Sequence, residues 1–251
     1  MRRKISLGAL IIICLAVVGA NWGVTHQVYQ PQINRLDSEI TSLQTQFAEI
    51  ENITITRYYQ WDYDGVQWEY SLPIAIKDYL AAKHKEKPSS AWEWVEMAND
   101  SDDIYIKRLV EYFEEVAHDK GFNTQEKLNF VIKFIQHLPY TDDALTTPYD
   151  DYPRSPLETL FDDGGDCEDS TILAVALLRE MHYDVALLGL IDAYHMALGV
   201  SVPLEWGTYY QHPDTGVKYF YVETSGDIWD IGEVPSEYLG KTAAICLVTQ
   251  D

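Results

Sequence analysis

The segment from Cys167 to Met181 limits the possible folds of this chain most strongly, because it reads as a helix that is apolar on nearly every side. Its apolar residues are Ile172, Leu173, Ala174, Val175, Ala176, Leu177, Leu178 and Met181. Such a helix is stable only where protein covers its whole surface. Gly164, Gly165 and Asp166 precede it; glycine allows a tight turn and aspartate is a favoured N-cap. We therefore expect this helix at the centre of the fold.

Strand-like runs follow the central helix. They lie at residues 185–191, 195–202, 218–224 and 243–249. One helix packed on an antiparallel sheet makes an α+β core. The long segment 203–217 is expected to be an inserted hairpin, and the proline-bearing segment 141–156 a polar loop.

Upstream of the core, two alternating aromatic runs, Tyr59–Tyr63 and Val66–Tyr70, are joined by Asp64-Gly65. This pattern predicts a β-hairpin. Its aromatic face is either a binding platform or a surface that packs on neighbouring helices.

Helices are expected over Ile74–His84 and Asp102–His118. A third begins at Asn123, which forms a capping box with Glu126, and ends before Pro139.

At the N-terminus, three basic residues precede the uncharged run Ile5–Val24, which is long enough to cross a bilayer as a helix. Basic residues favour the cytoplasmic side, so residues after Val24 are expected outside the membrane. We expect an uncleaved single-pass anchor. The alternative is a signal peptide that is removed near Ala20, leaving a secreted protein.

A heptad pattern follows this run. The apolar residues are spaced 4-3-4-3-4-3 and are Tyr29, Ile33, Leu36, Ile40, Leu43, Phe47 and Ile50. The pattern predicts a helical stalk that either self-associates or packs on its own protein. The expected organisation is thus an anchor or signal (1–24), a stalk (25–54), a hairpin with helices (55–122) and a C-terminal core (123–251).

The charge and cysteine content limit the classes of partner and of site that this chain can have. There are 40 Asp and Glu against 18 Lys and Arg, for a net charge of −22. A surface this acidic repels phosphate backbones, so nucleic acid is not expected as a partner. Outside the N-terminal run the cysteines are Cys167 and Cys246, which is not a disulfide framework or a zinc motif. A single disulfide between them is compatible with this count.

Cys167 is the candidate nucleophile. It falls in the first turn of the central helix, where the helix dipole favours the thiolate. Asp166, Glu168 and Asp169 surround it with negative charge, which raises the pKa of a thiol. A cationic partner is therefore required, and His195 at the start of a strand is assigned that role.

Glu223 is the candidate third member. If Val202 pairs opposite Lys218 in an antiparallel hairpin, Glu223 becomes a diagonal neighbour of His195 on the same face. A carboxylate there would fix the tautomer of the ring and stabilise imidazolium. Asp227 and Asp230 are the alternatives for this role. Taken singly, these residues also fit structural roles: a small core cysteine, a hydrogen-bonded histidine and a strand-end carboxylate.

Three segments resemble motifs of the transglutaminase-like superfamily. Gly165–Gly189, which opens Gly-Asp-Cys-Glu-Asp-Ser, resembles its Cys motif. His195–Val200 resembles its His strand, and Tyr221–Thr224 its third motif, where the acid is usually Asp rather than Glu. Residues 134–140 and 152–160 also resemble exported archaeal members.

The resemblance implies a papain/transglutaminase-like core of the α+β class, with a buried Cys-bearing helix against an antiparallel sheet, preceded by helices and the aromatic hairpin. It also implies thiol acyl transfer. An oxyanion donor is needed, for which the Cys167 backbone N–H, Gln136 and Tyr140 are candidates. No cofactor is expected, although in some bacterial relatives acids matching Asp166 and Glu168 bind calcium; here they also fit as an N-cap and a first-turn carboxylate.

We expect a membrane-anchored, extracytoplasmic cysteine peptidase or amidase acting on protein or peptide amides. The alternatives are a transamidating cross-linker, a catalytically silent domain that binds peptides or cell-envelope partners, and an assembly protein acting through the stalk and hairpin.

Overall fold

The computed structural model describes residues 29–50, 52–88, 90–98, 103–149, 152–226 and 229–248. The chain divides into two compact units, Met1–Ile53 and Thr54–Asp251. In the first unit, residues 29–50 form one continuous helix. Among the described residues, no helix is long and apolar enough to cross a membrane. The apolar run Ile5–Val24, expected as an anchor or signal segment, lies outside the described residues.

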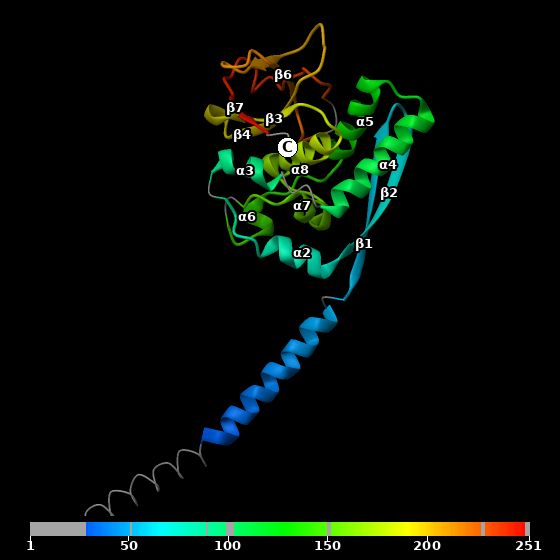
Figure 1. The fold of residues 1–251 in the computed structure, drawn as a ribbon. Coiled ribbons are helices and arrows are strands. Elements are labelled where there is room, and N and C mark those ends of the chain that lie inside the picture. Colours follow the sequence, from blue (N-terminus) through cyan, green and yellow to red (C-terminus); the bar gives the residue numbers. More distant parts are fainter. Residues whose placement is uncertain are drawn as a thin grey trace, which may run out of the picture. The chain divides into compact units, whose positions relative to one another are not determined.

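The second unit is built around α8 (Cys167–Glu180), which is buried from Glu168 to Leu178. On one side it packs against β3 (Val185–Leu190) and β4 (His195–Val200). Its other sides contact α4 (Ile104–Lys120), α5 (Thr124–Gln136) and α7 (Pro156–Asp162). Figure 1 shows α8 between the strands and these helices. The central helix is placed as its composition predicts.

A five-stranded sheet lies against α8 in the order β5-β6-β4-β3-β7, and every pairing is antiparallel. The remaining strands are β5 (Tyr209–Gln211), β6 (Lys218–Val222) and β7 (Ala244–Leu247). The four expected strands are present, and β5 comes from the segment expected as an inserted hairpin. The predicted α+β class, with a Cys-bearing helix against an antiparallel sheet, is confirmed.

The pairing of β4 with β6 sets the geometry of the site. Leu198 lies opposite Val222 and Val200 opposite Phe220. This is the register that places Val202 opposite Lys218, so the predicted alignment is confirmed.

The aromatic hairpin is β1 (Thr54–Tyr63) and β2 (Val66–Ala75), joined by a turn in which Asp64 and Gly65 have positive φ. Trp61 is buried and makes edge-to-face contacts with rings of α4 and α5. The hairpin belongs to the same hydrophobic core as α8. Its inward face is therefore a packing surface, as in the second of the two interpretations, and not a binding platform.

Several element boundaries differ from expectation. Helix α2 (Ile76–Lys83) starts after Ile74 and Ala75, which instead pair with β1. The capping box of Asn123 and Glu126 is present at α5. Three short helices are not predicted from the sequence: α3 (Ala91–Met97), α6 (Asp143–Thr146) and α7.

Candidate active site

Cys167 is the first residue of α8, and two glycines shape the turn that leads to it. Gly164 has a φ of +147°, and a Cβ on it would collide with the carbonyl oxygen of Pro139. Gly165 accepts a hydrogen bond from the Thr141 backbone N–H at 2.9 Å and donates to the Pro139 oxygen at 3.3 Å. The close approach to Pro139 thus requires a glycine at 164, and a Cβ on Gly165 would instead collide with the side chain of Asp169.

A buried ionic network anchors the first turn of α8. The Asp166 backbone N–H donates to Asp169 in a capping box. Arg154 is 2% exposed; its backbone N–H donates to Asp169 Oδ1 at 2.6 Å, and its guanidinium contacts the other oxygen of Asp169. The same guanidinium donates to Asp143 and to Thr146 Oγ1, each at 2.8 Å. These contacts fix the segment 141–156, expected to be a loop, to the helix that begins at Cys167.

The acids of this network outnumber their cation. Burial raises the pKa of Asp169 to about 7, although Arg154 opposes the shift. Burial, together with the hydrogen bond and charge of Glu168, raises the pKa of Asp166 to about 9. Burial also raises the pKa of Glu168. The acids around Cys167 therefore lack enough positive charge nearby to stay fully ionised near neutral pH.

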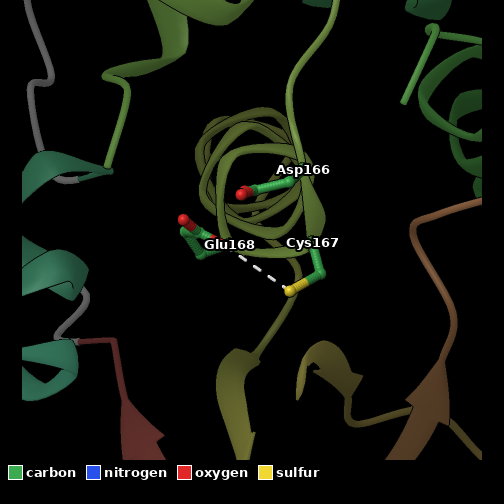
Figure 2. A group of neighbouring side chains, drawn as sticks. All are labelled: Asp166, Cys167 and Glu168. Carbon is green, nitrogen blue, oxygen red and sulfur yellow. Dashed lines mark hydrogen bonds between the residues drawn. The ribbon is translucent and has the colours of Figure 1, made fainter. Parts of the chain in front are cut away.

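The Cys167 thiol points toward this acidic side of the helix terminus. Its Sγ lies 3.5 Å from Glu168 Oε2 and donates to that carboxylate (Figure 2). Burial raises the pKa of the thiol, and the charges of Glu168 and Asp166 raise it further, while a hydrogen bond from the Met196 backbone lowers it. The resting group is a thiol, so a base must remove its proton before it can attack.

His195 and Glu223 meet as the register predicts. His195 opens β4, and its Nε2 lies 3.0 Å from Glu223 Oε2. Glu223 Oε1 accepts hydrogen bonds from the backbone N–H groups of Thr224 and Ser225 and from Ser225 Oγ. Burial alone would raise the pKa of Glu223, but the bonds from His195, Tyr221 and Ser225 outweigh it and lower the pKa. A carboxylate on Nε2 holds the proton there and leaves Nδ1 as the nitrogen that can accept a proton.

Two tyrosines that the sequence analysis missed complete the surroundings of His195. Tyr221 Oη donates to Glu223 Oε2 at 2.6 Å and lies 3.3 Å from His195 Nε2. Strand alternation places Tyr221 and Glu223 on one face, so this contact could have been found. The ring of Tyr238 stacks on the imidazole, with centroids 4.0 Å apart and 8° between planes. No spacing pattern in the sequence points to that contact.

The prediction that the Gln136 side chain donates a hydrogen bond to the oxyanion is wrong. Its Nε2 donates to the carbonyl oxygens of Glu223, at 2.8 Å, and Trp229, at 3.0 Å, so both amide hydrogens are used. Gln136 instead fixes the backbone that carries Glu223. Of the alternative acids, Asp230 is exposed and its backbone N–H bonds Glu233, whereas Asp227 lies outside the described residues.

Tyr140 lies near the candidate nucleophile Cys167, because its backbone forms a parallel bridge with Gly165. Its side chain is 62% exposed. Partial burial, followed by the electrostatic influence of the ionisable groups of Cys167 and Asp166, raises its pKa to about 12. It is therefore a neutral O–H donor at physiological pH and remains a candidate for the oxyanion, with the Cys167 backbone N–H.

The acids expected as calcium ligands are close together. Asp166, Cys167 and Glu168 each place one possible ligand atom within 4.8 Å of the others (Figure 2). Asp166 Oδ1 is buried and has no hydrogen-bond partner among the described residues. Carboxylate oxygens of this kind suit a hard cation such as Ca²⁺, whereas the sulfur does not.

Comparison with known proteins gave no matching family model and no match among curated proteins. Among solved structures, EGTA-treated LapG from Legionella pneumophila is 21% identical, covering 53% of this chain and 78% of LapG, with a TM-score of 0.31. Calcium-bound LapG is 18% identical, covering 54% of this chain and 81% of LapG, with a TM-score of 0.29. A candidate cysteine protease from Cytophaga hutchinsonii is 12% identical, covering 66% of this chain and 68% of that one, with a TM-score of 0.31.

Proposed function

We propose that this protein is a cysteine peptidase or amidase of the transglutaminase-like kind, acting on amide bonds of proteins or peptides. The observation that carries the proposal is the pairing of His195 Nε2 with Glu223 at 3.0 Å, on a strand whose next residue, Met196, bonds the Cys167 sulfur. A nucleophile, a base and an acid that orients the base are the parts that thiol acyl transfer needs.

In the proposed reaction, His195 Nδ1 takes the thiol proton and the Cys167 sulfur attacks the amide carbon. The oxyanion accepts hydrogen bonds from the Cys167 backbone N–H and from Tyr140. His195 then protonates the leaving nitrogen, the C–N bond breaks, and a thioester remains on Cys167. Water attacks this thioester while Nδ1 takes its proton, and the carboxylic acid leaves with the thiol restored. Glu223 stabilises the imidazolium in both halves of the reaction.

Hydrolysis and cross-linking share the thioester and differ in the second nucleophile. We propose water as that nucleophile. Mass spectrometry of a peptide substrate incubated with a primary amine separates the two reactions: hydrolysis yields the free acid, and transamidation yields the amine adduct.

Asp166 and Glu168 are the residues that would hold a calcium ion. The unpartnered, buried oxygen of Asp166 fits this role. A bound divalent cation would supply positive charge next to the thiol and so lower the pKa of Cys167. It would also favour the ionised form of the two acids, whose pKa values are raised in its absence.

We also propose that the catalytic unit works outside the cytoplasmic membrane. The support comes from the basic residues Arg2, Arg3 and Lys4 ahead of the apolar run Ile5–Val24. Carbonate extraction and protease protection of intact cells would test this placement.

The decisive experiment is the substitution Cys167→Ala, with Cys246→Ala as its matched control. Cys246 is a buried cysteine of β7 that lies opposite Leu187 in β3. We expect the first variant to lose peptide turnover and the second to retain it. Unchanged turnover in Cys167→Ala would overturn the proposal.

A domain that binds peptides without cleaving them is the second candidate. The raised pKa of the Cys167 thiol, 3.5 Å from Glu168, favours it. Measurable peptide affinity together with failure of Cys167 to react with iodoacetamide would support this candidate. Alkylation of Cys167 that parallels loss of turnover would exclude it.

A further inference from the structure

The apolar stripe of the N-terminal helix takes no part in the proposed reaction. It consists of the seven heptad residues, all of which lie on the helix formed by residues 29–50. Their exposed fractions run from 43% at Ile50 to 58% at Phe47. The helix thus presents an apolar face three heptads long with no interruption by a charged residue.

The residue types in this stripe are those of a two-stranded coiled coil. The spacing assigns the a positions to Ile33, Ile40 and Phe47. It assigns the d positions to Tyr29, Leu36, Leu43 and Ile50. β-branched residues at a with Leu at d favour parallel dimers over higher oligomers. The middle of the stripe, from Ile33 to Leu43, follows this rule at every position.

The flanking positions are compatible with a parallel, in-register pair. There, a g residue of one helix faces the e residue five positions later in its partner. These pairs are Gln32 with Asp37 and Glu39 with Gln44, so an amide faces each carboxylate and no two like charges meet. Arg35 pairs with Glu39 within its own helix, at 2.9 Å.

Polar groups on the outward face satisfy themselves within the helix. Thr41 Oγ1 donates to the Asp37 carbonyl at 2.8 Å, and Thr45 Oγ1 donates to the Thr41 carbonyl at 2.9 Å. The outer face therefore needs no partner. The face that a partner would cover is the exposed apolar stripe. Seven half-exposed side chains on each of two helices bury on the order of 1,000 Å² when they interlock, near the lower limit of specific interfaces.

We propose that the stripe binds a second copy of this chain, as a parallel, in-register, two-stranded coiled coil. The pairing joins two copies of the second unit through their N-terminal helices. It is independent of the proposed chemistry at Cys167, so the two proposals can fail separately.

Disulfide cross-linking of the full chain tests this arrangement, in a Cys14→Ser background and in detergent. In a parallel pair, a d residue meets its own copy across the axis at a spacing that a disulfide can bridge. Leu43→Cys should therefore form a covalent dimer under mild oxidation. Thr45→Cys, at the outward f position two residues on, should remain monomeric.

A second measurement distinguishes a stable dimer from a transient encounter that oxidation makes covalent. Sedimentation of Ile40→Asp should show at least a tenfold weaker self-association than wild type, and Thr45→Asp should match wild type. Alkylation of Cys167 should be the same in both variants. Equal cross-linking at residues 43 and 45 would overturn the proposal. A monomeric wild-type chain in which Leu43→Cys resists maleimide would also overturn it, and would show that the stripe packs on its own protein.

Discussion

Replacing Arg154 with Met tests whether the buried network fixes the start of α8, the helix that begins at Cys167. The substitution keeps most of the side-chain volume but removes the positive charge. Arg154, Asp143 and Asp169 are 2%, 1% and 0% exposed, so the two carboxylates would stay buried without their cation. The first turn of α8, where Cys167 lies, would lose its main anchor to the rest of the fold.

The expected cost follows from the burial of the ion pairs. Removing one partner of a buried pair costs about 3–5 kcal/mol, because an uncompensated charge remains in the interior. For a unit of this size, that corresponds to a drop in Tm of roughly 10 °C. Asp169 has a folded-state pKa raised to about 7, so the folded state binds a proton that the unfolded state releases near pH 4. Stability is therefore lost as pH rises through this window, and more steeply without Arg154.

Thermal unfolding at pH 5 and pH 8 measures both effects. We expect the deficit of Arg154→Met to be larger at pH 8 than at pH 5. Arg108→Met is the control, because that arginine is exposed and its loss should change stability by less than about 0.5 kcal/mol. The double variant Arg154→Met/Asp169→Asn should recover part of the loss, since it removes one orphaned charge. Equal stability of Arg154→Met and wild type at pH 8 would refute the anchoring role.

Three further perturbations probe the site. Glu223→Gln should lower turnover at least about 100-fold. Since the pKa of Glu223 is lowered, its carboxylate stabilises the fold above its ordinary pKa, and the Tm difference from wild type should narrow as pH falls below about 4. A Tm difference that does not narrow at all between pH 6 and pH 3 would contradict this assignment. Calcium added to EGTA-treated protein should speed iodoacetamide alkylation of Cys167 at pH 7 in wild type but not in Asp166→Asn; equal rates in both would exclude the calcium site. Gly165→Ala should destabilise the fold by about 1–3 kcal/mol in urea unfolding, because the new Cβ would collide with the side chain of Asp169; a neutral result would show that this turn can relax.

The parts of the fold that depend on periodicity could be predicted from the sequence. The apolar surface of Cys167–Met181 places that helix at the centre, and Asp64-Gly65 between aromatic runs identifies the hairpin. The meeting of His195 and Glu223 follows from strand parity alone: once the register is assumed, two residues on one face of paired strands must be neighbours. These features are local, or they follow from one regular pairing.

The parts that depend on packing between distant segments could not be predicted. Arg154 contacts Asp169 through a segment that reads as a polar loop, and nothing in its spacing shows that it is buried. Gln136 has the right chemistry for an oxyanion donor, but tertiary structure commits its amide to the carbonyl of Glu223. Tyr238 reaches His195 from a segment without a periodic pattern.

The pairing of β4 with β6 also governs which changes in chain length this site can tolerate. The connection between the strands bends at residues 212–216, outside the pairing that aligns His195 with Glu223. Insertions and deletions there should leave the alignment of His195 with Glu223 intact. One residue added between Lys218 and Val222 would turn the carboxylate of Glu223 to the opposite face of the sheet. Changes in chain length can thus be tolerated in the connection, whereas the number of residues in the paired strands must stay the same.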